Sequence, residues 1–197
     1  MKNRLAAFEF AVLFTVLPLH YAARAAPLDT LLASIAAEEG APSERVRLFM
    51  KRGQVTDVYY IDRIRPGRSR VLKNPRQGGM EMIVIDDKQW LRTGTGAWQA
   101  GSVPAGAKAQ AQPSLSLMLK NGLSNASERD EGDGRRVIEG EISWSGSASC
   151  KGKLQAIVER SGRPFFMAFV GECASKPTEF RQAFSYEGGF SIEPPNQ

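Results

Sequence analysis

Side chains that commonly carry catalysis are scarce in this chain of 197 residues, which has one histidine, His20, and two cysteines. His20 falls in a predicted leader, so the processed chain has no imidazole for a Ser-His-Asp or Cys-His mechanism or for binding zinc or copper. There is no S-x-x-K sequence, and Gly94-Thr95-Gly96 is interpreted as a turn because no helix is predicted after it. We therefore predict no catalytic residues, no metal site and no cofactor. One catalytic alternative stays open, a pair of carboxylates like that of glycosidases. Such a pair is defined by its distance in space, so sequence spacing does not test it.

The first 25 residues have the pattern of a secretory signal peptide. Lys2 and Arg4 precede an apolar run at 10–17, and Ala23-Arg24-Ala25 supplies a small-x-small cleavage motif. The alternative is a membrane anchor, but the run is far shorter than the roughly 20 apolar residues that span a bilayer. We predict cleavage after Ala25, leaving residues 26–197 as one exported, soluble domain in the periplasm.

The charge balance weakens the case for a nucleic-acid partner. Loss of Lys2, Arg4, Arg24 and Glu9 with the leader lowers the net charge from +5 to +3. Nucleic-acid-binding domains usually carry a strongly basic face. We therefore expect no nucleic acid among the partners.

The two cysteines fit an exported protein. Between Cys150 and Cys173 lies a candidate hairpin, with strands at 154–160 and 164–170 and Ser161-Gly162 as its turn. Counting outward from that turn places the cysteines opposite each other, so we predict a disulfide that closes the open end of the hairpin. Such a bridge stabilises by roughly 3 kcal/mol. The alternative, a reactive redox pair, lacks C-x-x-C spacing.

The rest of the chain is predicted to be mostly strand, in one domain. Short helices are expected at 27–39 and 113–121, a low-complexity loop at 101–112, and a polar, turn-rich segment at 124–136. Strand runs near ten-residue intervals indicate an antiparallel meander. These runs are 45–51, 55–61, 70–72, 80–85, 89–92, 137–144, the two arms of the cysteine hairpin, 180–186 and 190–192.

Two of these strands carry apolar residues on both faces, whereas a one-sided sheet would be polar on its solvent face. Two interpretations fit. Either a two-layer core closes on itself, or one face lines an apolar cavity that accepts a hydrophobic ligand, for which adaptable methionines are suited. The cavity interpretation makes these residues ligand-binding: Met80, Met82, Val84, Phe165, Met167 and Phe169.

A cluster of arginines lies at the junction of two predicted strands: Arg63, Arg65, Arg68 and Arg70. It fits a solvated sheet edge, which discourages pairing between sheets. It also fits a cavity mouth that holds a phosphate or carboxylate headgroup. Arg70 is the candidate ligand-binding arginine because it is closest to the apolar strand that follows.

The segment Arg65-Pro66-Gly67-Arg68-Ser69-Arg70, then Pro75, then Ile83-Val84-Ile85-Asp86 leading into Trp90, resembles the outer-membrane lipoprotein carriers and their relatives, the LolA-like periplasmic proteins. Arg70 matches the arginine of the family's motif. The resemblance implies an α+β, mostly β fold: a strongly curved antiparallel sheet, or unclosed barrel, wrapped around short helices and enclosing an apolar cavity.

That resemblance also implies a function. The chain is expected to carry or bind lipid or lipoprotein acyl chains, with a lipid or an acylated protein as its partner and a protein of the inner or outer membrane as a second candidate partner. The alternative is an envelope sensing or interaction module that uses the same fold without carrying cargo.

Overall fold

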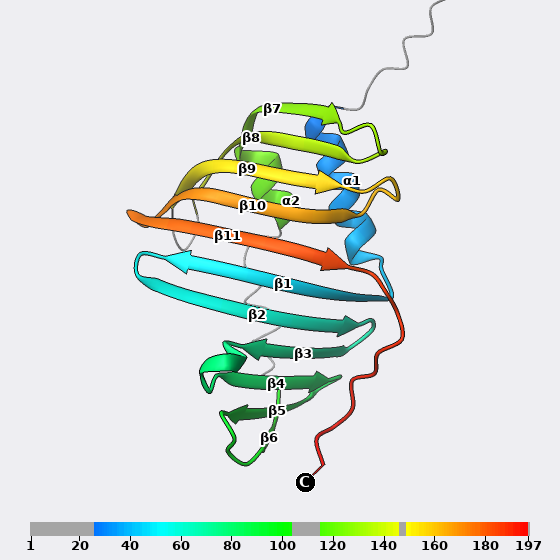
Figure 1. The fold of residues 1–197 in the computed structure, drawn as a ribbon, viewed down its shortest axis with the longest axis vertical. Helices are drawn as coiled ribbons and strands as arrows, with labels where there is room; N and C mark the ends of the chain where they lie inside the picture. The colour runs from blue at the N-terminus through cyan, green and yellow to red at the C-terminus, as the bar shows by residue number, and fades with distance from the viewer. Residues whose placement is uncertain (1–25, 104–114, 146–148, 197) are drawn as a thin grey trace, which may run out of the picture.

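The computed structural model describes residues 26–103, 115–145 and 149–196. The predicted signal peptide and most of the predicted loop at 101–112 lie outside these residues. In Figure 1 the described chain forms one curved sheet of eleven strands with two helices behind it. The strands are β1 (Ser43–Arg52), β2 (Val55–Ile64), β3 (Arg68–Lys73), β4 (Met80–Ile85), β5 (Lys88–Thr93), β6 (Gln99–Ser102), β7 (Leu123–Asp130), β8 (Arg136–Trp144), β9 (Cys150–Val158), β10 (Pro164–Cys173) and β11 (Lys176–Ser185).

The strands follow the order β6-β5-β4-β3-β2-β1-β11-β10-β9-β8-β7, and all neighbours pair antiparallel. Two meanders, β1 to β6 and β7 to β11, therefore join where β1 pairs with β11. Because β6 and β7 do not pair with each other, the sheet is curved but not closed into a barrel. The predicted unclosed antiparallel sheet is confirmed.

Two helices, α1 (Pro27–Glu39) and α2 (Leu115–Gly122), pack on one face of the sheet, over β7 to β10. We call this the helix face and the opposite one the outer face. Pro27 suits the first turn of α1, whose Leu31 and Ile35 are buried against the sheet together with Leu119 of α2. A Cβ added at Gly122 would lie 2.1 Å from the carbonyl oxygen of Ser143, so glycine permits the close approach of α2 to β8. Neither described helix is long and apolar enough to cross a membrane.

The C-terminal segment 186–196 packs on the outer face of β3, β4 and β5, and in Figure 1 its trace descends from the end of β11 past the ends of these strands. Ile192 is 2% exposed and packs with Ile83 and Trp90. Arg68 donates a hydrogen bond to the Ile192 carbonyl at 3.2 Å, and the Arg45 guanidinium lies 4.4 Å from the centre of the Phe190 ring. The outward isoleucines of β4 are therefore covered by this segment rather than by a second sheet.

The hairpin of β9 and β10 carries the predicted disulfide between Cys150 and Cys173. The two cysteines are paired in the strand register, as predicted. Near the turn the register differs, because Pro164 pairs with Val158 and Phe166 with Ile157. Phe165 is thus the extra residue of a bulge, which restores the predicted register at the cysteines.

Two predictions of local structure were wrong. The segment 124–136, expected to be turn-rich, contains most of β7, an edge strand. Residues 190–192, expected to be a strand, belong to the C-terminal segment and form no ladder. The edge strand β7 is polar, so its composition resembles that of a turn-rich segment. Residues 190–192 are largely apolar because they cover the sheet, so their composition resembles that of a strand.

Candidate functional site

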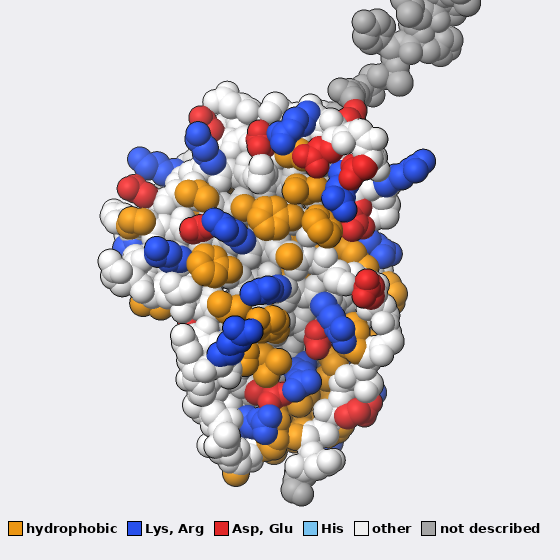
Figure 2. All heavy atoms as spheres, in the orientation of Figure 1, with side chains coloured by type: hydrophobic (Ala, Val, Ile, Leu, Met, Phe, Trp, Pro, Cys, Tyr) orange, Lys and Arg blue, Asp and Glu red, His pale blue; other side chains and the backbone are white. Residues whose placement is uncertain are grey.

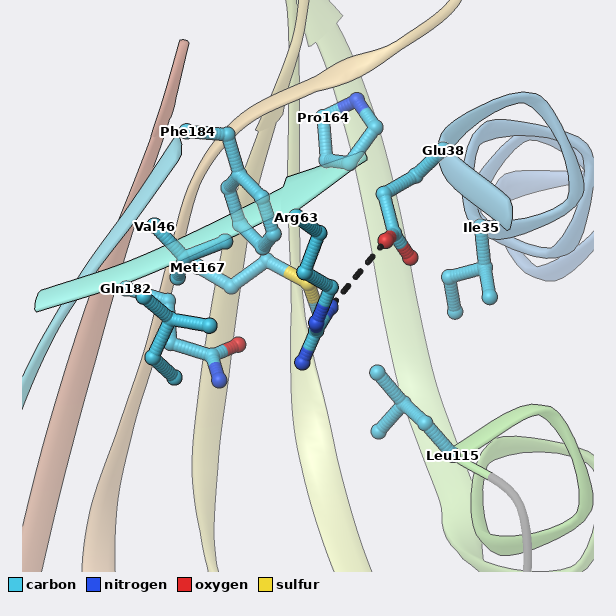
Figure 3. Close-up of a pocket in the computed structure, with 10 residues that line it drawn as sticks. Ile35, Glu38, Val46, Arg63, Leu115, Pro164, Met167, Gln182 and Phe184 are labelled. Atoms are coloured by element: carbon cyan, nitrogen blue, oxygen red, sulfur yellow. Dashed lines mark ion pairs between the residues drawn. The ribbon is translucent and has the colours of Figure 1, made fainter. Parts of the chain in front are cut away.

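A small hollow of about 120 Å³ lies on the helix face, between the two helices and the central strands. Figure 3 shows Ile35 of α1 and Leu115 of α2 on one side, opposite Val46, Met167 and Phe184 of the sheet. Ligand sites for small molecules usually exceed about 300 Å³, so the hollow alone holds only part of a ligand. Its lining residues are Ile35, Glu38, Val46, Ile61, Arg63, Leu115, Pro164, Met167, Gln182 and Phe184.

A row of apolar side chains leads from the hollow across the rest of the helix face. Each member is the register partner of the next, and opposed residues of an antiparallel pair share a face. With strands about 4.8 Å apart, the five steps of the row span roughly 24 Å. The row is Phe184, Val46, Ile61, Val71, Met82 and Leu91.

The far part of this row is incompletely covered. Ile61, Val71, Met82 and Leu91 are each partly exposed, and the described helices make their main contacts with β7 to β10 rather than with β2 to β5. A row of about 24 Å exceeds one leaflet of a bilayer, which is about half of its roughly 30 Å hydrocarbon core. The hollow and the row together form an apolar track long enough for one extended acyl chain.

A charged cluster borders the hollow at the end of α1. The fully buried Glu44 accepts a hydrogen bond from Arg63 at 2.5 Å and one from Arg65 at 3.2 Å through the same oxygen, Oε1. Arg65 also donates to Glu38 at 2.9 Å and to the Ala41 carbonyl at 2.9 Å. Figure 3 shows the Arg63 guanidinium pointing toward Glu38, with 3.6 Å between Nη1 and Oε1. Two arginines and two carboxyls therefore meet at this point of the apolar wall.

The two carboxyls are coupled. Burial, and then the neighbouring Glu44 carboxyl, raises the pKa of Glu38 to about 7, against the lowering effect of Arg65. Oε2 of Glu44 is buried and accepts no hydrogen bond from another described residue. This environment therefore favours the protonated form of Glu38 more than water does.

This arrangement predicts that stability falls as pH rises. With a pKa of about 7 in the folded state against 4.5 in the unfolded state, Glu38 keeps a proton that the unfolded chain loses. We expect the free energy of unfolding to fall by about 1 to 3 kcal/mol between about pH 5 and pH 7. Glu38→Gln keeps a donor but does not titrate, so it should flatten this slope in urea denaturation series at several pH values. An unchanged slope in the variant would assign the effect to another group.

The structure places four of the predicted ligand-binding residues on the track or beside it. Met167 lines the hollow, and Met82 belongs to the row. Met80 and Val84 are partly exposed and lie on the same face of β4 as Met82, two residues before it and two residues after it.

The other three lie elsewhere. Phe169 is fully buried in the core, stacked 5.2 Å from the ring of Phe180, and does not line the hollow. Phe165 is 36% exposed at the bulge, where the Arg135 guanidinium lies over its ring, so it does not share the alternation of Met167 and Phe169. Arg70 lies on the outer face, paired with Glu81 at 2.6 Å.

Among the clustered arginines, Arg63 borders the hollow and Arg70 does not. The sequence did not predict a role for Glu38 or Glu44. One signal could have found Glu44. It has the same strand parity as the inward-facing Val46, and a carboxylate at a core position usually needs a cationic partner. Within the described residues there is no group of three or more acidic, histidine or cysteine side chains able to hold a metal ion.

No family model and no curated protein matches this chain. Among solved structures it is similar to the lipoprotein LppX of Mycobacterium tuberculosis, with 15% identity, a TM-score of 0.62 and coverage of 85% of this chain and 98% of LppX. A DUF1329 family protein from Desulfovibrio piger also matches, with 12% identity, a TM-score of 0.35 and coverage of 85% and 96%. The chain shares the fold of LppX, which confirms the LolA-like fold predicted from sequence.

Proposed function

We propose that this protein binds the acyl chain of a lipid or lipoprotein on its helix face and acts as a carrier or binding protein in the periplasm. The observation that carries the proposal is the apolar track, which runs from the hollow under the helices along Ile61, Val71 and Met82. Contiguous exposed apolar surface is unusual on a soluble protein and often marks a binding site. The likeness to LppX, named as a lipoprotein, supports a fold suited to the envelope.

The proposal includes export. Cleavage after Ala25 would leave residues 26–197 as a single domain, and the disulfide is of the kind that persists in oxidising compartments. The charged cluster gives the track a polar end beside Arg63, where a headgroup could lie while the chain follows the row. No step of this function requires chemistry on the ligand.

A bulky substitution that narrows the apolar track tests the proposal through its effect on fatty-acid binding. Ile61 lines the hollow, so Ile61→Trp places an indole in the path of the chain. We expect this variant to bind cis-parinaric acid, a fluorescent fatty acid, at least about tenfold more weakly, a loss of about 1.4 kcal/mol. The matched control is Val55→Trp on the same strand, where the side chain is 63% exposed and lies away from the hollow.

The result that contradicts the proposal is equal affinity in the wild type and both variants. Mass spectrometry of protein purified without detergent supplies a second measurement, with a stoichiometric lipid expected in the wild type. A protein that is consistently empty, and that co-purifies with a membrane protein, would instead favour the envelope sensing module.

A further inference from the structure

A second and larger hollow, of about 460 Å³, lies on the outer face of the sheet. It is formed by the central strands β1, β10 and β11, on the side of the sheet away from the helices. Its volume is within the range of small-molecule sites. It is lined by Arg47, Phe49, Lys51, Phe166, Glu179, Arg181 and Ala183.

The rim of this hollow is cationic. Arg181 pairs with Glu179 at 2.5 Å, which balances one of three positive side chains. Arg47 lies 5.6 Å from the centre of the Tyr60 ring, and neither Arg47 nor Lys51 makes an ion pair with another described residue. Two cations at the centre of the face are therefore left for an anion from outside.

The floor of the hollow is apolar. Phe49 and Phe166 are partly exposed there, and nearby Val170 on β10 is 56% exposed. Figure 2, which views this face, shows hydrophobic and basic side chains interspersed over the central strands. Basic side chains mixed with exposed aromatic ones are typical of proteins that lie on anionic membranes.

We propose that this outer hollow binds the phosphate headgroup of an anionic phospholipid at a membrane surface. Arg47 and Lys51 contact the phosphate, as an arginine fork and an ammonium point charge do, while Phe49 and Phe166 contact the glycerol and upper acyl region. A peptide strand has no place here, because β1, β10 and β11 are already paired on both sides. The contact orients the helix face and its ligand track away from that membrane.

Co-sedimentation with phosphatidylcholine vesicles, with and without phosphatidylglycerol, tests this site. We expect binding only to vesicles with phosphatidylglycerol, weakened by salt. The double variant Arg47→Glu/Lys51→Glu should bind at least about tenfold more weakly. The control Arg76→Glu/Lys120→Glu makes the same change in net charge at two exposed residues away from the hollow, and should bind within about twofold of the wild type.

Four results overturn the site. Equal losses in both double variants would assign binding to net charge. Release by millimolar glycerol phosphate would indicate a site for free phosphate. Equally tight binding of polyglutamate would indicate an acidic protein partner. Equal binding to vesicles of phosphatidylcholine alone would show that Arg47 and Lys51 do not recognise an anionic headgroup. Ile61→Trp should keep vesicle binding, so failure of this site and failure of the ligand track are separate results.

Discussion

Replacing Phe169 with alanine is expected to lower the free energy of unfolding by about 3 to 5 kcal/mol. Phe169 is fully buried and is the largest of the fully buried side chains in the described chain. Its ring lies 5.3 Å from that of Trp144 and 5.2 Å from that of Phe180, so it joins β8, β10 and β11 at the core of the helix face. The substitution leaves a cavity that this sheet cannot close, because its strands are fixed by their ladders.

Urea denaturation followed by tryptophan fluorescence measures this effect. The matched control is Phe165→Ala, the same substitution on the same strand, at a position 36% exposed. We expect the control to cost about 1 kcal/mol or less. A cost at Phe169 no larger than about 1 kcal/mol would contradict its assignment to the core.

The second large loss of stability is expected when the disulfide is removed. Cys150→Ala/Cys173→Ala opens a loop whose ends are separated by 23 residues, which should destabilise the protein by about 3 kcal/mol. Both cysteines are buried in the same core cluster as Phe169, so alanine also loses some packing. The loss should appear as a lower urea midpoint.

Reductant provides the control for this experiment. Dithiothreitol should lower the midpoint of the wild type toward that of the double variant and leave the variant unchanged. A wild-type midpoint that does not move with complete reduction, verified by thiol counting, would show that the bridge does not limit stability.

Much of the fold follows from local patterns. The helix at Pro27–Glu39 has its predicted bounds because a proline starts it, a glycine follows it, and its leucines share one face. The meander and the pairing of the cysteines follow from alternation and turn spacing. These features depend on neighbours in sequence, which is why a single sequence discloses them.

The position of the arginines depended on information that the sequence does not carry. Arg63 and Arg70 belong to neighbouring strands, and the turn between them sets which residues pair. Arg70 pairs with Asp62, so Arg63 falls on the opposite face, beside the hollow. One residue more or less in that turn would exchange the two faces, because side chains alternate along a strand.

The apolar track was predictable only in part. Alternation identified the face of Met82 and Met167, but these residues lie on strands far apart in the sheet order. Their distance from each other is fixed by the junction of β1 with β11, which local sequence does not reveal. Phe165 left the predicted face because a one-residue bulge changes parity without a clear sequence signal.

The junction of β1 with β11 has a consequence for how the chain acquires its structure. In the described sheet every other strand pair joins consecutive strands, whereas Val46 pairs with Phe184 across most of the chain. Pairings between such distant segments close large loops and form slowly. Until β11 is synthesised and in place, β1 presents a bare edge to other chains. Premature termination before Lys176 would therefore produce a polypeptide with a strong tendency to aggregate rather than a smaller working protein.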